Sequence, residues 1–136
     1  MNSASFPPCL ELRCGPVTAV DLALYAAASG DHNPLHLDEQ QSRRAGFDDP
    51  LVHGMLSMAY VGRLFTDAFG PSALVSLQTR FTGTAARGST LTIRAQLAEH
   101  DLRSARYAVT ATSDTGTDVI TGSATIGKRG ETPVGP

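Results

Sequence analysis

Residues 54–69 read GMLSMAYVGRLFTDAF, and this stretch decides the fold. Its apolar residues are distributed around the whole helix rather than along one stripe, and Gly70-Pro71 ends the run. A helix that is apolar on nearly every side is typical of one that other elements enclose. We therefore expect a central helix over residues 54–69 that is buried on most of its sides.

The residues after this helix change to the two-residue period of strands. In residues 91–97 every second residue is apolar, and similar strands fit residues 74–82, 105–113 and 118–127. Residues 10–14 alternate in the same way before the helix, and Gly15-Pro16 ends them. Strands that follow one another with no helix between them favour an antiparallel sheet.

Two shorter helices are expected before the central one. Thr18 is a good N-cap for a helix that runs to Ser29-Gly30. Its apolar residues at helical spacing are Val20, Ala23, Leu24 and Ala27. Residues 38–45 form a second, short and polar helix closed by Gly46.

Together these elements predict an α+β protein with a single hot-dog fold, in which a curved antiparallel sheet wraps around the central apolar helix. About five strands cannot cover every side of that helix and still protect both edges of the sheet. We therefore expect a second chain to extend the sheet or to close its open side, with a homodimer as the minimum assembly.

Length and composition limit the classes of function. The chain has 136 residues and a formal net charge of -2. That length supports one domain, placed at residues 9–127, with flexible tails at 1–8 and 128–136. Lys and Arg are scattered, which argues against nucleic acid and an anionic membrane surface as partners. Without a long apolar span or a leader pattern, we expect a cytoplasmic protein.

The cysteines and histidines give little support for redox or metal chemistry. Cys9 and Cys14 would lie roughly 16 Å apart on one strand, too far to form a disulfide. His32 and His36 have the spacing of a helical metal pair, but Pro34 lies between them and argues against a helix. We therefore expect no metal and no other cofactor.

The richest source of chemistry is the turn over residues 29–36, which reads SGDHNPLH. The turn-favouring Asn33-Pro34 can fold the side chains of Asp31 and His36 toward one point. His53-Gly54 follows at the start of the central helix, where unpaired backbone N–H groups favour negative charge. A carboxylate, an imidazole and free N–H groups are what is needed to move a proton beside a carbonyl. Asn-Pro alone is also a common turn signal, so the short motif by itself would favour a structural role.

The longer pattern resembles the MaoC-like hydratases and dehydratases, which include (R)-specific enoyl-CoA hydratases. Their motif Gly-Asp-x-Asn-Pro-x-His-x-Asp has its counterpart in GDHNPLHLD at residues 30–38, followed by LVHGML at residues 51–56. The resemblance covers roughly residues 10–127 and is strongest from 25 to 60. It implies the same hot-dog fold.

The resemblance also implies a hydro-lyase that reversibly hydrates a trans-2-enoyl thioester to a (3R)-hydroxyacyl thioester. Asp31 and His36 would hold the water, and the N–H of Gly54 would hold the thioester oxygen. The substrate would be linked to coenzyme A or to an acyl carrier protein. Candidates for binding the phosphates of coenzyme A or an acidic carrier surface are the scattered Arg43, Arg44, Arg80 and Arg87. Further substrate-binding candidates are Asn33, Phe47, His53, Met55 and Ser57, with Met58 as another wall residue. Asn33 would mainly shape the turn, and His53 would orient the loop.

Two departures from the family pattern affect the substrate. The hydroxyl-bearing residue that relatives often carry along the central helix is replaced in AYVGR at residues 59–63, so Ser57 or Tyr60 would substitute. The segment at residues 80–89 lacks the usual Pro and Asp. Alternative functions are a specialised polyketide-pathway dehydratase, a hot-dog thioesterase, or a non-catalytic acyl-binding partner subunit.

Overall fold

The structure is a computed structural model, and it describes residues 6–127. Its elements, in chain order, are β1 (Cys9–Cys14), α1 (Ala19–Ser29), the 3₁₀ turn η1 (Pro34–His36), α2 (Glu39–Arg44), α3 (Gly54–Phe69), β2 (Leu74–Phe81), β3 (Leu91–His100), β4 (Ser104–Ser113) and β5 (Asp118–Gly127). The predicted helices and strands are all present. Strand β3 continues three residues beyond its predicted end.

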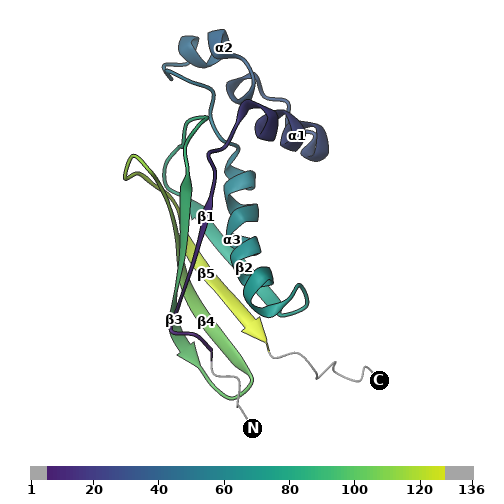
Figure 1. Cartoon of the computed structure of the whole chain (residues 1–136), viewed down its shortest axis with the longest axis vertical. Coiled ribbons are helices and arrows are strands. Elements are labelled where there is room, and N and C mark those ends of the chain that lie inside the picture. The colour runs from purple at the N-terminus through teal and green to yellow at the C-terminus, as the bar shows by residue number, and fades with distance from the viewer. Residues whose placement is uncertain (1–5, 128–136) are drawn as a thin grey trace.

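The five strands form one antiparallel sheet in the order β1-β3-β4-β5-β2. The sheet curves around α3, and α1 and α2 lie together beyond one end of that helix (Figure 1). The predicted hot-dog fold is confirmed. Strands β1 and β2 are the two edges, and β2 is largely open to solvent.

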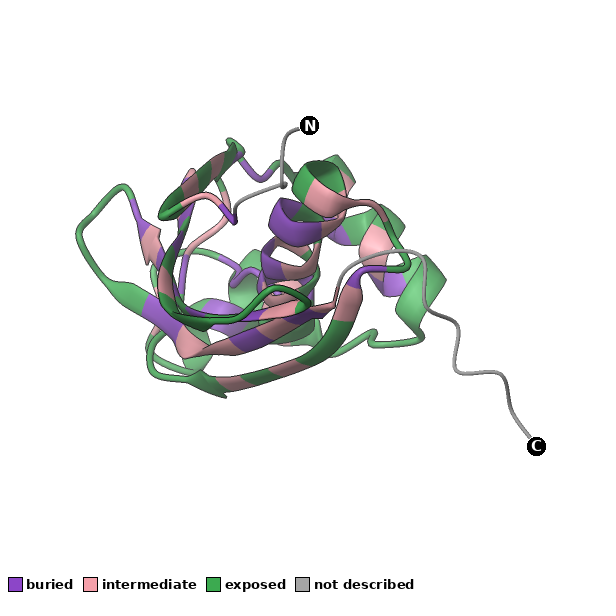
Figure 2. Ribbon diagram, turned by 90° about the horizontal axis from the view of Figure 1, so that it is seen from below, coloured by how far each residue is buried: buried purple, intermediate pink, exposed green. Residues whose placement is uncertain are grey.

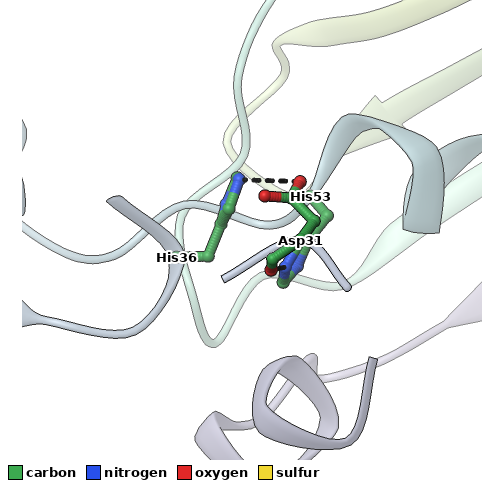
Figure 3. A group of neighbouring side chains, drawn as sticks. All are labelled: Asp31, His36 and His53. Carbon is green, nitrogen blue, oxygen red and sulfur yellow. Dashed lines mark hydrogen bonds and ion pairs between the residues drawn. The ribbon is translucent and has the colours of Figure 1, made fainter. Parts of the chain in front are cut away.

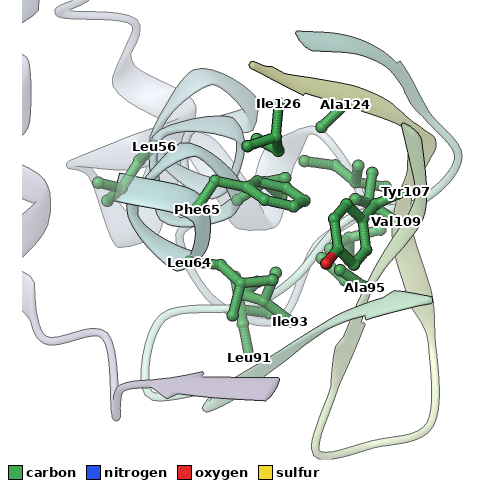
Figure 4. Close-up of a cluster of buried hydrophobic side chains, with 14 of the residues drawn as sticks. Leu56, Leu64, Phe65, Leu91, Ile93, Ala95, Tyr107, Val109, Ala124 and Ile126 are labelled. Carbon is green, nitrogen blue, oxygen red and sulfur yellow. The ribbon is translucent and has the colours of Figure 1, made fainter. Parts of the chain in front are cut away.

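The core lies between α3 and the concave face of the sheet (Figure 4). Phe65 of α3 is fully buried, and its ring centroid lies 5.5 Å from that of Tyr107 on β4. Alternate residues of the strands point inward and complete the cluster: Leu91, Ile93, Ala95, Val109, Ala124 and Ile126. This alternation is the two-residue period that predicted the strands.

The predicted tail at residues 1–8 is wrong at its inner end. Phe6 is only 9% exposed and belongs to the core. The Pro7 carbonyl accepts a hydrogen bond of 2.8 Å from the Tyr107 hydroxyl, and the Pro8 carbonyl accepts one of 2.9 Å from the Leu97 N–H. An aromatic side chain and two carbonyl contacts order these residues. The rest of that tail, 1–5, and the tail at 128–136 lie outside the described residues.

Helix α3 is buried on one side rather than on most sides, which corrects the prediction (Figure 2). Its buried residues are Leu56, Ser57, Val61, Leu64 and Phe65. Met55 is 55% exposed, and Ala59 and Arg63 are also exposed. The physical reason is that one curved sheet covers only one side of a helix.

Helix α1 is also buried on one side only. The residues that it buries are Leu22 and Ala26, whereas Val20 and Leu24 of the predicted apolar stripe are 65% and 64% exposed. The helix therefore carries apolar residues on two faces, and this chain covers one of them.

Both cysteines are free thiols, Cys14 buried and Cys9 exposed. Among residues 6–127, no helix combines the length and the apolar character needed to cross a membrane.

Candidate active site

The turn that links α1 to η1 brings the predicted pair together. Gly30 ends α1 in the left-handed conformation, with φ of 78°, and its N–H donates to the Ala26 carbonyl. The Asp31 carboxylate then accepts from the Asn33 N–H at 3.2 Å, and the Asn33 side chain accepts from the Leu35 N–H at 3.0 Å. These local bonds are how Asp and Asn side chains replace regular backbone pairing in turns. The side-chain oxygen of Asn33 thus shapes the turn as predicted, while its predicted substrate contact stays a prediction.

The Asp31 carboxylate and the His36 ring face each other across a short gap (Figure 3). Asp31 Oδ2 lies 3.6 Å from His36 Nε2, and the side chains are 49% and 15% exposed. His36 Nδ1 lies 2.9 Å from the Leu51 carbonyl oxygen, an acceptor, so this nitrogen carries the proton in the neutral ring. The lone pair of Nε2 is therefore directed toward Asp31.

The two atoms are close enough together for one water molecule beside them to reach both. A separation of 3.6 Å is longer than a direct hydrogen bond. A carboxylate oxygen and an unprotonated imidazole nitrogen are both acceptors, so neither can donate to the other. One water molecule has two O–H groups and can donate to both. Its oxygen lone pairs then remain free to attack a carbon atom.

His53 lies behind the pair and is fully buried. Its Nε2 donates to the Asp31 backbone carbonyl at 3.2 Å, and its ring stacks on His36 with a centroid distance of 3.8 Å and an interplanar angle of 18°. Tyr25 of α1 contacts the same ring edge to face at 4.8 Å. Burial lowers the pKa of His53, and its neighbour His36 lowers it further. The ring is buried and is not among the described residues that line the cavity, so its predicted substrate contact stays a prediction.

A cavity of about 190 Å³ opens beside His36 at the first turn of α3. Its lining comes from four parts of the chain: His36, Val52, Gly54, Ser57, Phe81, Gly83, Thr84, Ala85 and Val119. His53 provides no side-chain cap for α3, which leaves the first N–H groups of the helix available to a ligand. Gly54 therefore lies where the sequence predicted an oxyanion donor.

Gly54 also lies against an aromatic ring. A Cβ atom added there would lie 3.2 Å from Cε1 of Phe81, so any larger residue would press on this ring. Phe81 is 50% exposed at the end of β2. The ring and the helix N-terminus thus form adjacent walls of the same cavity.

Several cavity residues were not predicted from the sequence. Phe81, Gly83, Thr84 and Ala85 belong to the segment that departs from the family pattern, yet they form a wall. Backbone pairing brings them there, because the Val52 N–H donates to the Ala85 carbonyl at 2.8 Å. The sequence did place Arg80-Phe81 at the end of a predicted strand. Nothing in the local sequence, however, indicated that this end lies beside the first turn of α3.

The remaining candidates divide into two groups. Ser57 lines the cavity and donates to the His53 carbonyl at 3.5 Å, so it is the α3 hydroxyl at this site. Phe47, Met55 and Met58 are not among the described residues that line the cavity. Met55 points to solvent on the open side of α3, where a single chain has no element to receive it.

One potential ligand atom from each of Asp31, His36 and His53 lies within 4.8 Å of the others, so we tested whether the set fits a metal ion. Each imidazole binds a metal in the plane of its ring, at about 2.0 to 2.1 Å for zinc. The two rings are nearly parallel and 3.8 Å apart, so their in-plane lone pairs do not meet at one point. His53 Nε2 is also engaged by the Asp31 carbonyl. The donor set therefore does not fit a metal centre.

The fold and the site define a class of protein. It is a hot-dog protein in which an imidazole and a helix N-terminus line one cavity, and a carboxylate lies 3.6 Å from that imidazole without itself being among the described lining residues. This arrangement is suited to acid/base chemistry beside a carbonyl.

Comparison with known proteins identifies the family. The sequence profile described as MaoC like domain matches residues 11–119, and the chain belongs to this family. A probable enoyl-CoA hydratase 2 of Dictyostelium discoideum is 38% identical over 71 residues, which cover 50% of this chain and 24% of that protein. The mitochondrial 3-hydroxyacyl-[acyl-carrier-protein] dehydratase of Arabidopsis thaliana is 41% identical over 61 residues, or 45% of this chain and 37% of that protein. The matches thus span well under two thirds of these relatives.

Solved structures agree with the fold. The unliganded R-hydratase PhaJ1 from Pseudomonas aeruginosa superposes with a TM-score of 0.82 and 29% identity, over 90% of this chain and 81% of that one. The (R)-hydratase from A. caviae gives a TM-score of 0.81 at 24% identity, over 92% of this chain and 98% of that one, and at this identity it supports the fold alone.

Proposed function

We propose that this chain is a hydro-lyase that reversibly adds water to a trans-2-enoyl thioester and forms a (3R)-hydroxyacyl thioester. The observation that carries the proposal is the pair of acceptors, Asp31 Oδ2 and His36 Nε2, set 3.6 Å apart beside the cavity. The names of similar proteins, enoyl-CoA hydratase and 3-hydroxyacyl dehydratase, support the same reaction class. The nine-residue motif at positions 30–38 supports it independently.

The proposed reaction follows from these positions. The water donates its two O–H groups to Asp31 and His36, and its oxygen attacks carbon 3 of the substrate. The pair takes one proton from the water as the new C–O bond forms, and a proton is returned to carbon 2. Negative charge that builds on the thioester oxygen is held by the Gly54 N–H, a kind of contact that contributes about 10² to 10³ in rate. The net change is one water added across the double bond.

The cavity favours a small acyl group. Its volume of about 190 Å³ is below the range of about 300 to 1,000 Å³ that is typical of ligand sites. Val52, Phe81, Ala85 and Val119 give it apolar walls. We therefore propose short acyl chains as substrates. The rest of the thioester, coenzyme A or a carrier protein, would extend outside the cavity.

Substitution of the pair tests this assignment. The Asp31→Asn and His36→Ala variants should each lower hydration of crotonyl-CoA by about 10² to 10⁴, the range for general acid/base groups. His32→Gln is the matched control, because His32 is exposed in the same turn. Loss of the conjugated-enoyl absorbance measures the rate, and thermal unfolding shows that each variant is folded. Folded variants of the pair that hydrate at the wild-type rate would refute the assignment.

Thioester hydrolysis is less well supported. The acidic residue of α3 is Asp67, near the far end of the helix, where it pairs with Arg63 at 3.4 Å. Release of free thiol from an acyl-CoA without any 3-hydroxy product would nevertheless move the assignment to that reaction. A polyketide-pathway substrate and a non-catalytic partner-subunit role stay alternatives; conversion of acyl thioesters only after a second polypeptide is added would favour the latter.

We also propose that the chain acts as a homodimer in the cytoplasm. The exposed apolar residues Val20 and Leu24 of α1 and Met55 of α3 support a second chain, as does the unpaired edge of β2. Leu24→Asp should shift the protein from dimer to monomer in sedimentation, whereas Leu102→Asp, at an isolated exposed position, should not. A monomeric wild-type protein would refute the dimer, and cell fractionation tests the location.

A further inference from the structure

One buried residue contacts every part of the proposed catalytic apparatus. The His53 ring donates to the Asp31 backbone carbonyl and lies flat against the His36 ring. Its own carbonyl accepts the N–H groups of Leu56 and Ser57, at 3.1 and 3.2 Å, and so begins α3. The next residue, Gly54, carries the proposed oxyanion donor.

These contacts require one particular form of the His53 ring. Nε2 faces a carbonyl oxygen, so it must carry a proton. Nδ1 is buried and has no hydrogen-bond partner among the described residues. A proton on Nδ1 would leave a buried donor unsatisfied, which is costly. The ring is therefore held as the neutral Nε2–H tautomer, the opposite of the Nδ1–H tautomer of His36.

We propose that His53 is the positioning residue of this active site. It sets the water-holding gap between Asp31 and His36 and fixes that gap relative to the N–H of Gly54. The hydrogen bond places the Asp31 backbone, and the stacked face limits tilting of the His36 ring. This inference rests on the proposed hydration reaction, because it assigns a role within that reaction.

Displacement of Asp31 and His36 from each other should affect the chemical step more than it affects substrate binding. His53 is fully buried and is not among the described residues that line the cavity, so a substrate in the cavity would touch its wall rather than His53. A shift of about 1 Å in a catalytic group can lower the rate about 10²-fold. Loss of the His53 contacts should therefore lower kcat strongly and change KM little.

Three variants of the full chain separate the hydrogen bond from the ring. His53→Gln can place an amide N–H near the position of Nε2, whereas the shorter His53→Asn reaches only the position of Nδ1. His53→Phe keeps a flat ring against His36 but has no donor. With crotonyl-CoA as substrate, we expect the Gln variant to keep kcat within about tenfold of wild type, while the Asn and Phe variants lose about 10².

The outcomes distinguish this inference from the proposed function. If folded Asn and Phe variants keep the wild-type kcat, or if the Gln variant loses as much as the Asn variant, the inference is overturned. A wild-type chain with no hydratase activity would instead refute the proposed function. Independently of activity, ¹⁵N NMR of the histidine rings should show the Nε2–H tautomer for His53 and the Nδ1–H tautomer for His36 at neutral pH. A charged or Nδ1–H His53 would overturn the inference even if the variants fail to fold.

Discussion

Acidification should destabilise this protein through His53. Burial lowers the pKa of this side chain in the folded state from its ordinary value of 6.5. Above that pH, the folded and unfolded chains both hold a neutral ring, and stability is full. As the pH falls below about 6.5, the unfolded chain takes up a proton that the folded chain resists, so the free energy of unfolding decreases.

The size of the effect follows from the closed surroundings of the ring. Full burial and an Nδ1 atom without a partner among the described residues oppose protonation of the folded ring. The loss of stability therefore begins as the pH falls through the ordinary histidine pKa and grows as the pH falls further. The slope cannot exceed about 1.4 kcal/mol per pH unit for a single proton.

Urea unfolding across this range measures the effect at one fixed protein concentration. His53→Gln has no titratable ring, so its stability should fall less steeply than that of wild type. His32→Gln, which removes an exposed histidine of the same turn, is the matched control. The difference between the two slopes isolates His53 from the carboxylates, which titrate in all three proteins. Parallel curves for wild type and His53→Gln would show that the folded ring accepts a proton freely, and the burial argument would be wrong.

Three further predictions concern the core, the segment before the first strand, and the cavity. Phe65→Ala should lower the free energy of unfolding by about 3 to 5 kcal/mol, because a fully buried ring is lost; a loss below 1 kcal/mol in urea would contradict this. Tyr107→Phe removes the hydrogen bond to Pro7 and should cost about 1 kcal/mol in the same assay, whereas an unchanged midpoint would deny that bond any net effect. Phe81→Ala should enlarge the cavity and raise kcat/KM for octenoyl-CoA relative to crotonyl-CoA about tenfold, and an unchanged ratio over the chain-length series would exclude Phe81 as a wall that limits chain length.

Much of the fold could be predicted because the local sequence periods are strong. The change from helical to two-residue period after Gly70 separated α3 from the four strands that follow it. The turn residues Gly30 and Asn33-Pro34 were sufficient to predict that Asp31 and His36 come together. In each case the decisive interactions lie within a few residues along the chain.

The sequence was less informative where contacts are distant. Helix α1 is apolar on two faces, and its period cannot tell which face is buried in the folded chain; Leu22 is buried and Leu24 is not. Phe81 reaches the cavity only because β2 ends beside the first turn of α3. His53 was interpreted as a loop-orienting residue, but its stacking on His36 depends on two segments that only the folded chain brings together.

The bond from the Tyr107 hydroxyl to the Pro7 carbonyl joins the start of the domain to the middle of its sheet. An affinity tag should therefore be fused ahead of Phe6, so that the contacts of residues 6–8 with the core and the sheet stay intact. A fragment trimmed to begin at Cys9 would expose the inner end of the core. Such a fragment should be more prone to aggregation and to protease digestion than the longer chain, although its active-site residues would be unchanged.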